Sequence, residues 1–197
     1  MQKPLIIAHR GDTANFPENT VEAFQSAVER GADGIEFDVH LNDQGVPIVV
    51  HNYLFDRSQT YPTLLEIVEM FGKRTLLEIE IKSLEDEAVS KVAEIIDRFR
   101  PLEIEITSSV PVLFDSIFEH FPNDRRGLIF RSNLIEEWMP QDFVEYLILR
   151  HMALTNATVL HFELDQYFPR LIQSLHEKGY RAHSFTRGKF QDISNRC

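Results

Sequence analysis

Short apolar segments alternate with amphipathic segments along most of this chain. Residues 5–8 form a predicted buried strand, and the following segment places Val21 and Phe24 on one face of a helix. Asn19 is predicted to cap that helix and Gly31 to end it. Because strands that alternate with helices build parallel sheets with crossover helices, the pattern predicts an α/β fold.

One pair of predicted strands forms a hairpin, whereas the others run parallel. Residues 34–41 and 46–50 flank a short polar turn that ends in Gly45. The remaining predicted strands are residues 76–81, 104–107, 127–130, 157–162 and 180–185. Without the second arm of the hairpin, seven strands are parallel. We therefore predict a (β/α)8 TIM-type barrel that lacks its last helix and eighth strand, in a single domain of residues 1–197.

The charge and the cysteine content of the chain limit the kinds of partner and the compartment that we expect for it. A formal net charge of −11 disfavours nucleic acid, because proteins that bind a phosphate backbone gather positive charge. The single cysteine, Cys197, excludes an internal disulfide framework. No apolar run approaches the roughly 20 residues that a membrane span needs. We therefore expect a cytoplasmic protein that binds a small-molecule substrate, with no nucleic acid partner and no membrane span.

Acidic side chains occupy one face of two predicted strands. Glu36 and Asp38 alternate with apolar neighbours in residues 34–41, and Glu80 does so in residues 76–81. Two interpretations are open: a solvated face of an edge strand, or a group of acids inside a barrel. Crowded buried acids repel one another, and a hard divalent cation with oxygen ligands offsets that cost best. The second interpretation makes these three acids a candidate metal site.

Two histidines and two basic residues are predicted near these acids. His9 follows the first strand, at the end where barrel enzymes assemble their sites, and hairpin pairing is predicted to bring His51 opposite Glu36. A lone strand-end histidine is more often structural, but two beside an acid cluster form a candidate general acid and base. Arg10 and Lys82 are candidate phosphate-binding residues, although each taken singly would be a plain surface charge.

Five spaced motifs resemble the glycerophosphodiester phosphodiesterase family. In order, they are Ala8-His9-Arg10-Gly11, Pro17-Glu18-Asn19-Thr20, Glu36-Phe37-Asp38-Val39, Pro47-Ile48-Val49-Val50-His51 and Ile79-Glu80-Ile81-Lys82. Weaker similarity continues through Ser108-Ser109 and His161 to Phe185-Thr186. The resemblance implies a (β/α)8 barrel that hydrolyses glycerophosphodiesters to sn-glycerol 3-phosphate and an alcohol.

The resemblance also implies a role for each residue of the site. It implies that His9 and His51 act as general acid and base, and that Mg²⁺ or Ca²⁺ is bound by Glu36, Asp38 and Glu80. It also implies that phosphate is bound by Arg10 and Lys82, with supporting positions at Glu18 and Asn19. For Glu18 an equal alternative is a charge near a helix N-terminus.

Four departures from the family pattern affect these expectations. Asn52 stands where the family usually has aspartate, which is expected to weaken a hydrogen bond behind His51. Residues 53–61 are short where some members carry a subdomain, which predicts an open pocket. Glu78 adds a buried acid where asparagine is common. The family's closing segment is absent after Phe185, so the domain is predicted to be truncated at its C-terminal end.

Two functions remain open at this point. One is an active phosphodiesterase, and the other is a catalytically silent, truncated barrel that binds metal or phosphate without turnover. The complete motif set favours the enzyme. A lysophospholipid-cleaving relative on a membrane surface would need a basic amphipathic segment, and none is evident. An incomplete barrel also predicts self-association through its open edge.

Overall fold

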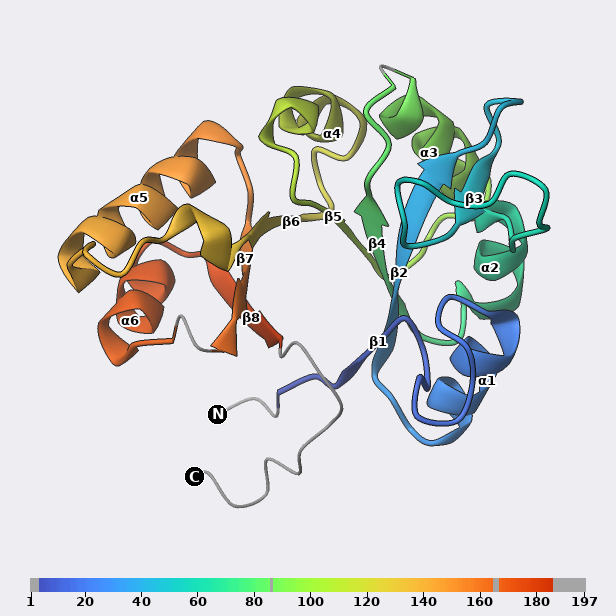
Figure 1. Ribbon diagram of the computed structural model, residues 1–197, viewed down its shortest axis with the longest axis horizontal. Coiled ribbons are helices and arrows are strands. Elements are labelled where there is room, and N and C mark those ends of the chain that lie inside the picture. Colours follow the sequence, from blue (N-terminus) through green and yellow to red (C-terminus); the bar gives the residue numbers. More distant parts are fainter. Residues whose placement is uncertain (1–3, 86, 165–166, 186–197) are drawn as a thin grey trace. The chain divides into compact units, whose positions relative to one another are not determined.

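Two compact units make up the chain, residues 1–126 and residues 127–197. The computed structural model describes residues 4–85, 87–164 and 167–185. Helices and strands alternate in both units (Figure 1). This alternation confirms the α/β class that the hydrophobic pattern predicts.

The first unit is a parallel sheet with one antiparallel addition. Its strands are β1 (Ile7–His9), β2 (Gly34–Leu41), β3 (Pro47–Val49), β4 (Leu76–Ile81) and β5 (Ile104–Ser108). Its helices are α1 (Val21–Glu29), α2 (Leu64–Phe71), α3 (Ala88–Asp97), the 3₁₀ turn η1 (Pro111–Leu113) and α4 (Phe114–His120). Strands β1, β2, β4 and β5 are parallel neighbours in that order, and β3 pairs antiparallel with β2. The predicted hairpin is therefore confirmed.

The second unit continues the same alternation. Strand β6 (Arg125–Phe130) begins at the end of the first unit, and its residues from Gly127 pair parallel with β7 (Val159–Glu163). Strand β8 (Arg181–Phe185) pairs parallel with β7. The helical segments of this unit are η2 (Ser132–Leu134), α5 (Gln141–Leu154) and α6 (Pro169–Glu177).

Within the described residues, the element order is that of a (β/α)8 TIM-type barrel without its last helix and eighth strand. Seven parallel strands are described, and β3 is the extra hairpin arm. The described part of the chain ends at Phe185, with β8 as its last strand. The polar tail of residues 186–197 lies outside the described residues. That residues 1–197 fold as one domain stays a prediction.

The two central strands of the first unit are buried along their whole length, on both faces. Every residue of β2 and β4 is buried. On the apolar face, Phe37 packs against Phe24 of α1, whose ring also contacts Phe71 of α2, with ring centroids 5.7 and 6.2 Å apart. The opposite face carries the acids. The interpretation of this polar face as a solvated edge is therefore wrong.

Three local predictions are corrected by the structure. Thr20, not Asn19, caps α1, because the Asn19 backbone is left-handed (φ 58°) and its side chain bonds Asp38. Helix α3 begins at Ala88 rather than near residue 83, since the Ser83 hydroxyl accepts a hydrogen bond from a β2 backbone amide. The hairpin pairs Leu41 with Pro47, one residue away from the predicted register.

The start of α2 provides a stability prediction. The spacing of Thr63 and Glu66 predicts a capping box, and the structure confirms it, because each side chain bonds the other residue's backbone amide. We expect Thr63→Ala to lower the free energy of unfolding by about 1 kcal/mol in urea denaturation. Thr63→Ser, which keeps the hydroxyl, is the matched control. Equal stability of the alanine variant and the wild type would show that the capping box contributes little.

Candidate active site

Three carboxylates converge on the buried polar face of β2 and β4. Parallel register places Asp38 beside Glu80, while Glu36 lies two residues earlier on the same face of β2. One carboxylate oxygen of each acid lies within 4.8 Å of the others. The three residues are 5, 0 and 7% exposed in chain order. The structure thus brings together the predicted metal-binding residues.

Asp38 lies at the centre of this group and has three polar contacts, two of them hydrogen bonds and one an ion pair. Lys82 Nζ donates to its Oδ1 over 3.2 Å, and Arg10 Nε lies 3.2 Å from its Oδ2. Asn19 Nδ2 donates to the same Oδ2 over 2.9 Å. Lys82 Nζ also lies 4.0 Å from an oxygen of Glu80. Both predicted phosphate-binding residues therefore reach the carboxylate group, and the side chain of Asn19 is hydrogen-bonded to Asp38.

A strained turn aims Arg10 into the site. Arg10 and Gly11 both have positive φ, 59° and 86°. A Cβ at Gly11 would lie 2.7 Å from Ala23 of α1, so only glycine fits there. The Arg10 backbone amide donates to Glu36 Oε2 over 3.1 Å, and Arg10 Nη1 donates to Glu18 over 2.9 Å. Glu18 therefore neutralises part of the Arg10 charge.

The two histidines approach the acids from different segments. His9, at the end of β1, has Nε2 3.8 Å from Glu36 Oε2, and 57% of its side chain is exposed. The register of β2 and β3 excludes the predicted pairing of His51 with Glu36, because Val39 pairs with Val49. His51 still lies where it interacts electrostatically with Asp38. Its Nδ1 lies 3.2 Å from the amide oxygen of Asn52.

The protonation of the site follows from burial and from the neighbouring charges. Burial raises the pKa of Glu36 well above its ordinary value, and the charge of Asp38 raises it further. Burial also opposes ionisation of Asp38, but Lys82 and Arg10 outweigh it and hold the pKa of Asp38 below its usual range. Burial lowers the pKa of both His9 and His51, assisted by the neighbouring cations. Both imidazoles are therefore neutral at neutral pH and able to accept a proton.

These opposite shifts predict how the stability of the metal-free protein depends on pH. The raised pKa of Glu36 stabilises the fold at low pH, and this contribution is lost as the pH rises through the raised value. The lowered pKa of Asp38 stabilises the fold above its ordinary value, and this contribution is lost as the pH falls through the lowered one. The lowered pKa values of His9 and His51 contribute with the opposite sign over the same window, because the unfolded imidazoles bind protons that the folded ones do not. We therefore expect the unfolding free energy of Glu36→Gln in urea titrations to rise relative to that of the wild type as the pH increases from weakly acidic to neutral. A difference that stays constant over this range would contradict the assignment.

Comparison with known proteins decides the family. The model described as "Glycerophosphoryl diester phosphodiesterase family" matches residues 9–113, which is more than half of the chain. The chain belongs to this family. It is therefore an enzyme of the phosphodiesterase class. Residues 9–113 include all the acids, histidines and basic residues described above, so the family match falls on the site itself.

Relatives along nearly the whole chain agree with this assignment. A glycerophosphodiester phosphodiesterase from Caldanaerobacter subterraneus is 30% identical over 97% of this chain and 88% of its own length. The solved glycerophosphodiester phosphodiesterase of Thermotoga maritima is 27% identical, with a TM-score of 0.70 over 96% of this chain and 88% of its own. An Oleispira antarctica phosphodiesterase, solved with the product sn-glycerol-3-phosphate, shares the fold with a TM-score of 0.78 at 21% identity, over 94% of this chain and 85% of its own.

Several residues of this family member complete the site although the sequence pattern did not reveal them. Ser109 Oγ donates to Glu80 Oε1 over 3.4 Å. Thr107 pairs in register with Glu80, is fully buried, and its hydroxyl has no hydrogen-bond partner among the described residues. Tyr53 places its ring 5.5 Å from Lys82 Nζ. For Ser109, the one signal in the sequence was the resemblance of Ser108-Ser109 to the family. For Tyr53, no periodicity in the sequence gave a signal.

In the described part of the chain, no helix is long and apolar enough to cross a membrane.

Proposed function

We propose that this protein hydrolyses glycerophosphodiesters to sn-glycerol 3-phosphate and an alcohol, with Mg²⁺ or Ca²⁺ as its cofactor. The observation that supports the proposal best is the buried group of Glu36, Asp38 and Glu80 with two basic side chains beside it. Few structural roles require three buried acids so close together, since their mutual repulsion destabilises the fold. The Oleispira antarctica structure supports the proposed product, because it contains sn-glycerol-3-phosphate.

The residues of the carboxylate group fit a hard divalent cation. All three acids offer oxygen ligands, and their oxygens lie within 4.8 Å of one another. Burial raises the pKa of Glu36 most, and the charges of Asp38, Glu78 and Glu80 raise it further, so a cation held beside these acids would favour their ionised forms. Glu36, Asp38 and Glu80 would hold the cation. The cation would supply positive charge that stabilises the phosphodiester and orients the glycerol hydroxyls.

The remaining residues have complementary roles in the proposal. His9 and His51 act as general acid and base. The neutral imidazole of one accepts a proton, while the other donates as an imidazolium, which the neighbouring acids Glu36 (3.8 Å from His9) and Asp38 (near His51) stabilise. Arg10 and Lys82 bind the phosphate. They would exchange part of their pairing with Asp38 for the phosphate oxygens. Asn19 orients Asp38, and Glu18 holds the Arg10 guanidinium.

Product identity tests this proposal most simply. Glycerophosphocholine should yield sn-glycerol 3-phosphate and choline, detected by coupled enzymatic assay and by ³¹P NMR. Phosphocholine and glycerol would place the cleavage on the wrong side of the phosphorus and contradict the proposal. Binding without any turnover, across several glycerophosphodiesters and with either metal, would instead favour the catalytically silent barrel.

The geometry of Arg10 gives a prediction of its own. Arg10→Lys keeps the charge but loses the planar fork that reaches Asp38 through Nε and Glu18 through Nη1. We expect kcat/KM to fall by about tenfold or more, which is the loss of one charge-assisted hydrogen bond. Arg30→Lys, at an exposed position on the far end of α1, is the matched control. Equal kcat/KM for Arg10→Lys and the wild type would remove Arg10 from the phosphate site.

The expected compartment and partners belong to the same proposal. A cytoplasmic location fits a chain with one cysteine, and the net charge of −11 argues against nucleic acid. Self-association through the sheet edge at β8 is also proposed. Among the described residues, β8 is the last strand in the sheet order and pairs on one side, with β7, so its other side is an edge. Concentration-dependent size-exclusion profiles would support it, and a constant monomeric profile would contradict it.

A further inference from the structure

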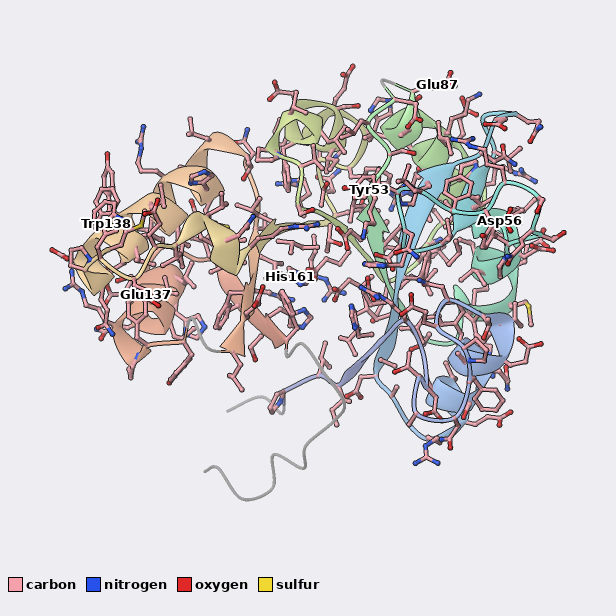
Figure 2. All side chains as sticks on the ribbon, in the orientation of Figure 1. Tyr53, Asp56, Glu87, Glu137, Trp138 and His161 are labelled. Atoms are coloured by element: carbon pink, nitrogen blue, oxygen red, sulfur yellow. The ribbon has the colours of Figure 1, made fainter. Side chains whose placement is uncertain are left out.

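An aromatic ring lies beside the basic residue proposed to bind phosphate. Lys82 Nζ lies 5.5 Å from the ring centroid of Tyr53, a cation–π distance. Tyr53 belongs to the segment between β3 and α2, and its side chain is labelled in Figure 2. Lys82 is 3% exposed, whereas Tyr53 is 48% exposed. The ring therefore lies between a buried ammonium group and the solvent.

Buried aromatic contacts hold the Tyr53 ring in place. His40 of β2 meets it at 80° with ring centroids 5.1 Å apart, and Phe55 contacts His40 at 5.9 Å. His40 is itself 4% exposed. Edge-to-face contacts of this kind favour one ring orientation over others. Tyr53 is thus fixed by the core of the first unit although half of it is exposed.

The other partners of Lys82 are the carboxylates proposed to bind the divalent cation. Its ammonium group contacts Asp38 at 3.2 Å and Glu80 at 4.0 Å. A cation held by these same carboxylates would weaken their attraction for Lys82, since like charges repel at short range. The Tyr53 ring attracts the ammonium group without being a metal ligand. It therefore holds Lys82 in a way that metal binding does not remove.

We propose that Tyr53 is a positioning residue that holds the Lys82 ammonium group ready for the substrate phosphate. This inference rests on the proposed function of the same site. It assigns the ring, and not the hydroxyl, as the acting group. It also gives the short segment after β3 a function at the phosphate, which the sequence pattern does not indicate.

Two substitutions separate the ring from the hydroxyl. Tyr53→Leu should raise KM for glycerophosphocholine about three- to tenfold and raise the inhibition constant for inorganic phosphate similarly, with kcat within about threefold of wild type. Tyr53→Phe should restore wild-type values. Leu54→Ala changes the adjacent residue, which is 97% exposed, and serves as the matched control. Thermal melting of each variant checks that the fold is unaltered.

A measurement on Lys82 itself distinguishes this inference from the proposed function. The rate of Lys82 acetylation by acetic anhydride, followed by peptide mass spectrometry in Mg²⁺, does not depend on turnover. It should rise severalfold in Tyr53→Leu and remain at the wild-type value in Tyr53→Phe. Equal rates in all three proteins would overturn the positioning role, even if the enzyme is active. An inactive protein that shows the expected rates would instead contradict the proposed function and leave the positioning role supported.

Two kinetic outcomes would also overturn the inference. Equal losses in Tyr53→Phe and Tyr53→Leu would mean that the hydroxyl is the acting group. A loss confined to glycerophosphocholine, with none for glycerophosphoglycerol or inorganic phosphate, would mean that Tyr53 contacts the alcohol of the substrate and does not act through Lys82.

Discussion

Glu36→Gln and Asp38→Asn are each expected to lower kcat/KM by about 10³-fold or more, because a metal ion contributes several kcal/mol of charge stabilisation. An amide keeps the shape of the carboxylate but cannot supply the charge that holds a hard cation. The two acids are buried and lie with Glu80 in one group. Activity on glycerophosphocholine and metal affinity from calorimetry should therefore fall together.

The two variants should differ in stability although both lose activity. Asp38→Asn leaves buried Lys82 and the Arg10 guanidinium without their carboxylate, which is expected to destabilise the metal-free fold by about 3 kcal/mol or more. Glu36→Gln should leave the metal-free fold at least as stable as the wild type, because the raised pKa of Glu36 already favours its uncharged form. Glu69→Gln, at an exposed position of α2, is the control. Metal affinity close to wild type in either variant would remove that acid from the metal site.

His9→Ala and His51→Ala are each expected to lower kcat by roughly 10²-fold or more, the usual contribution of a positioned acid or base. Substrate affinity should largely survive, since the phosphate contacts are proposed to come from Arg10 and Lys82. His176→Ala, at an exposed position of α6, is the control and should leave kcat unchanged. If one histidine variant kept a wild-type kcat at saturating substrate, that histidine would be structural.

The hydrophobic pattern predicted the elements well because side-chain polarity is periodic in this chain. Strands β2 and β4 alternate acidic with apolar side chains, and both faces are buried. Element boundaries were less predictable, since tertiary contacts override local signals. Asn19 is a residue type common at helix caps, but its side chain is hydrogen-bonded to Asp38. Ser83 is hydrogen-bonded to the backbone of β2 and does not start a helix. Neither partner is visible from neighbouring residues in the sequence.

The site was predictable where residue spacing along a strand determines it, and less so where loops complete it. The acids share a face by alternation, so their convergence followed from the sequence. His51 depended on hairpin register, and the predicted register was one residue away from that of the structure. Tyr53 reaches Lys82 from a segment without periodicity, and only the folded chain reveals that contact.

Metal dependence tests the central proposal most directly. The protein should be stripped with EDTA, dialysed, and assayed for sn-glycerol 3-phosphate release from glycerophosphocholine while Mg²⁺ or Ca²⁺ is added back. We expect no release above background after stripping and recovery of the full rate at saturating metal, with no recovery in Glu36→Gln. Full activity in excess EDTA would contradict the proposal, because the buried carboxylates would then serve some purpose other than holding a catalytic cation.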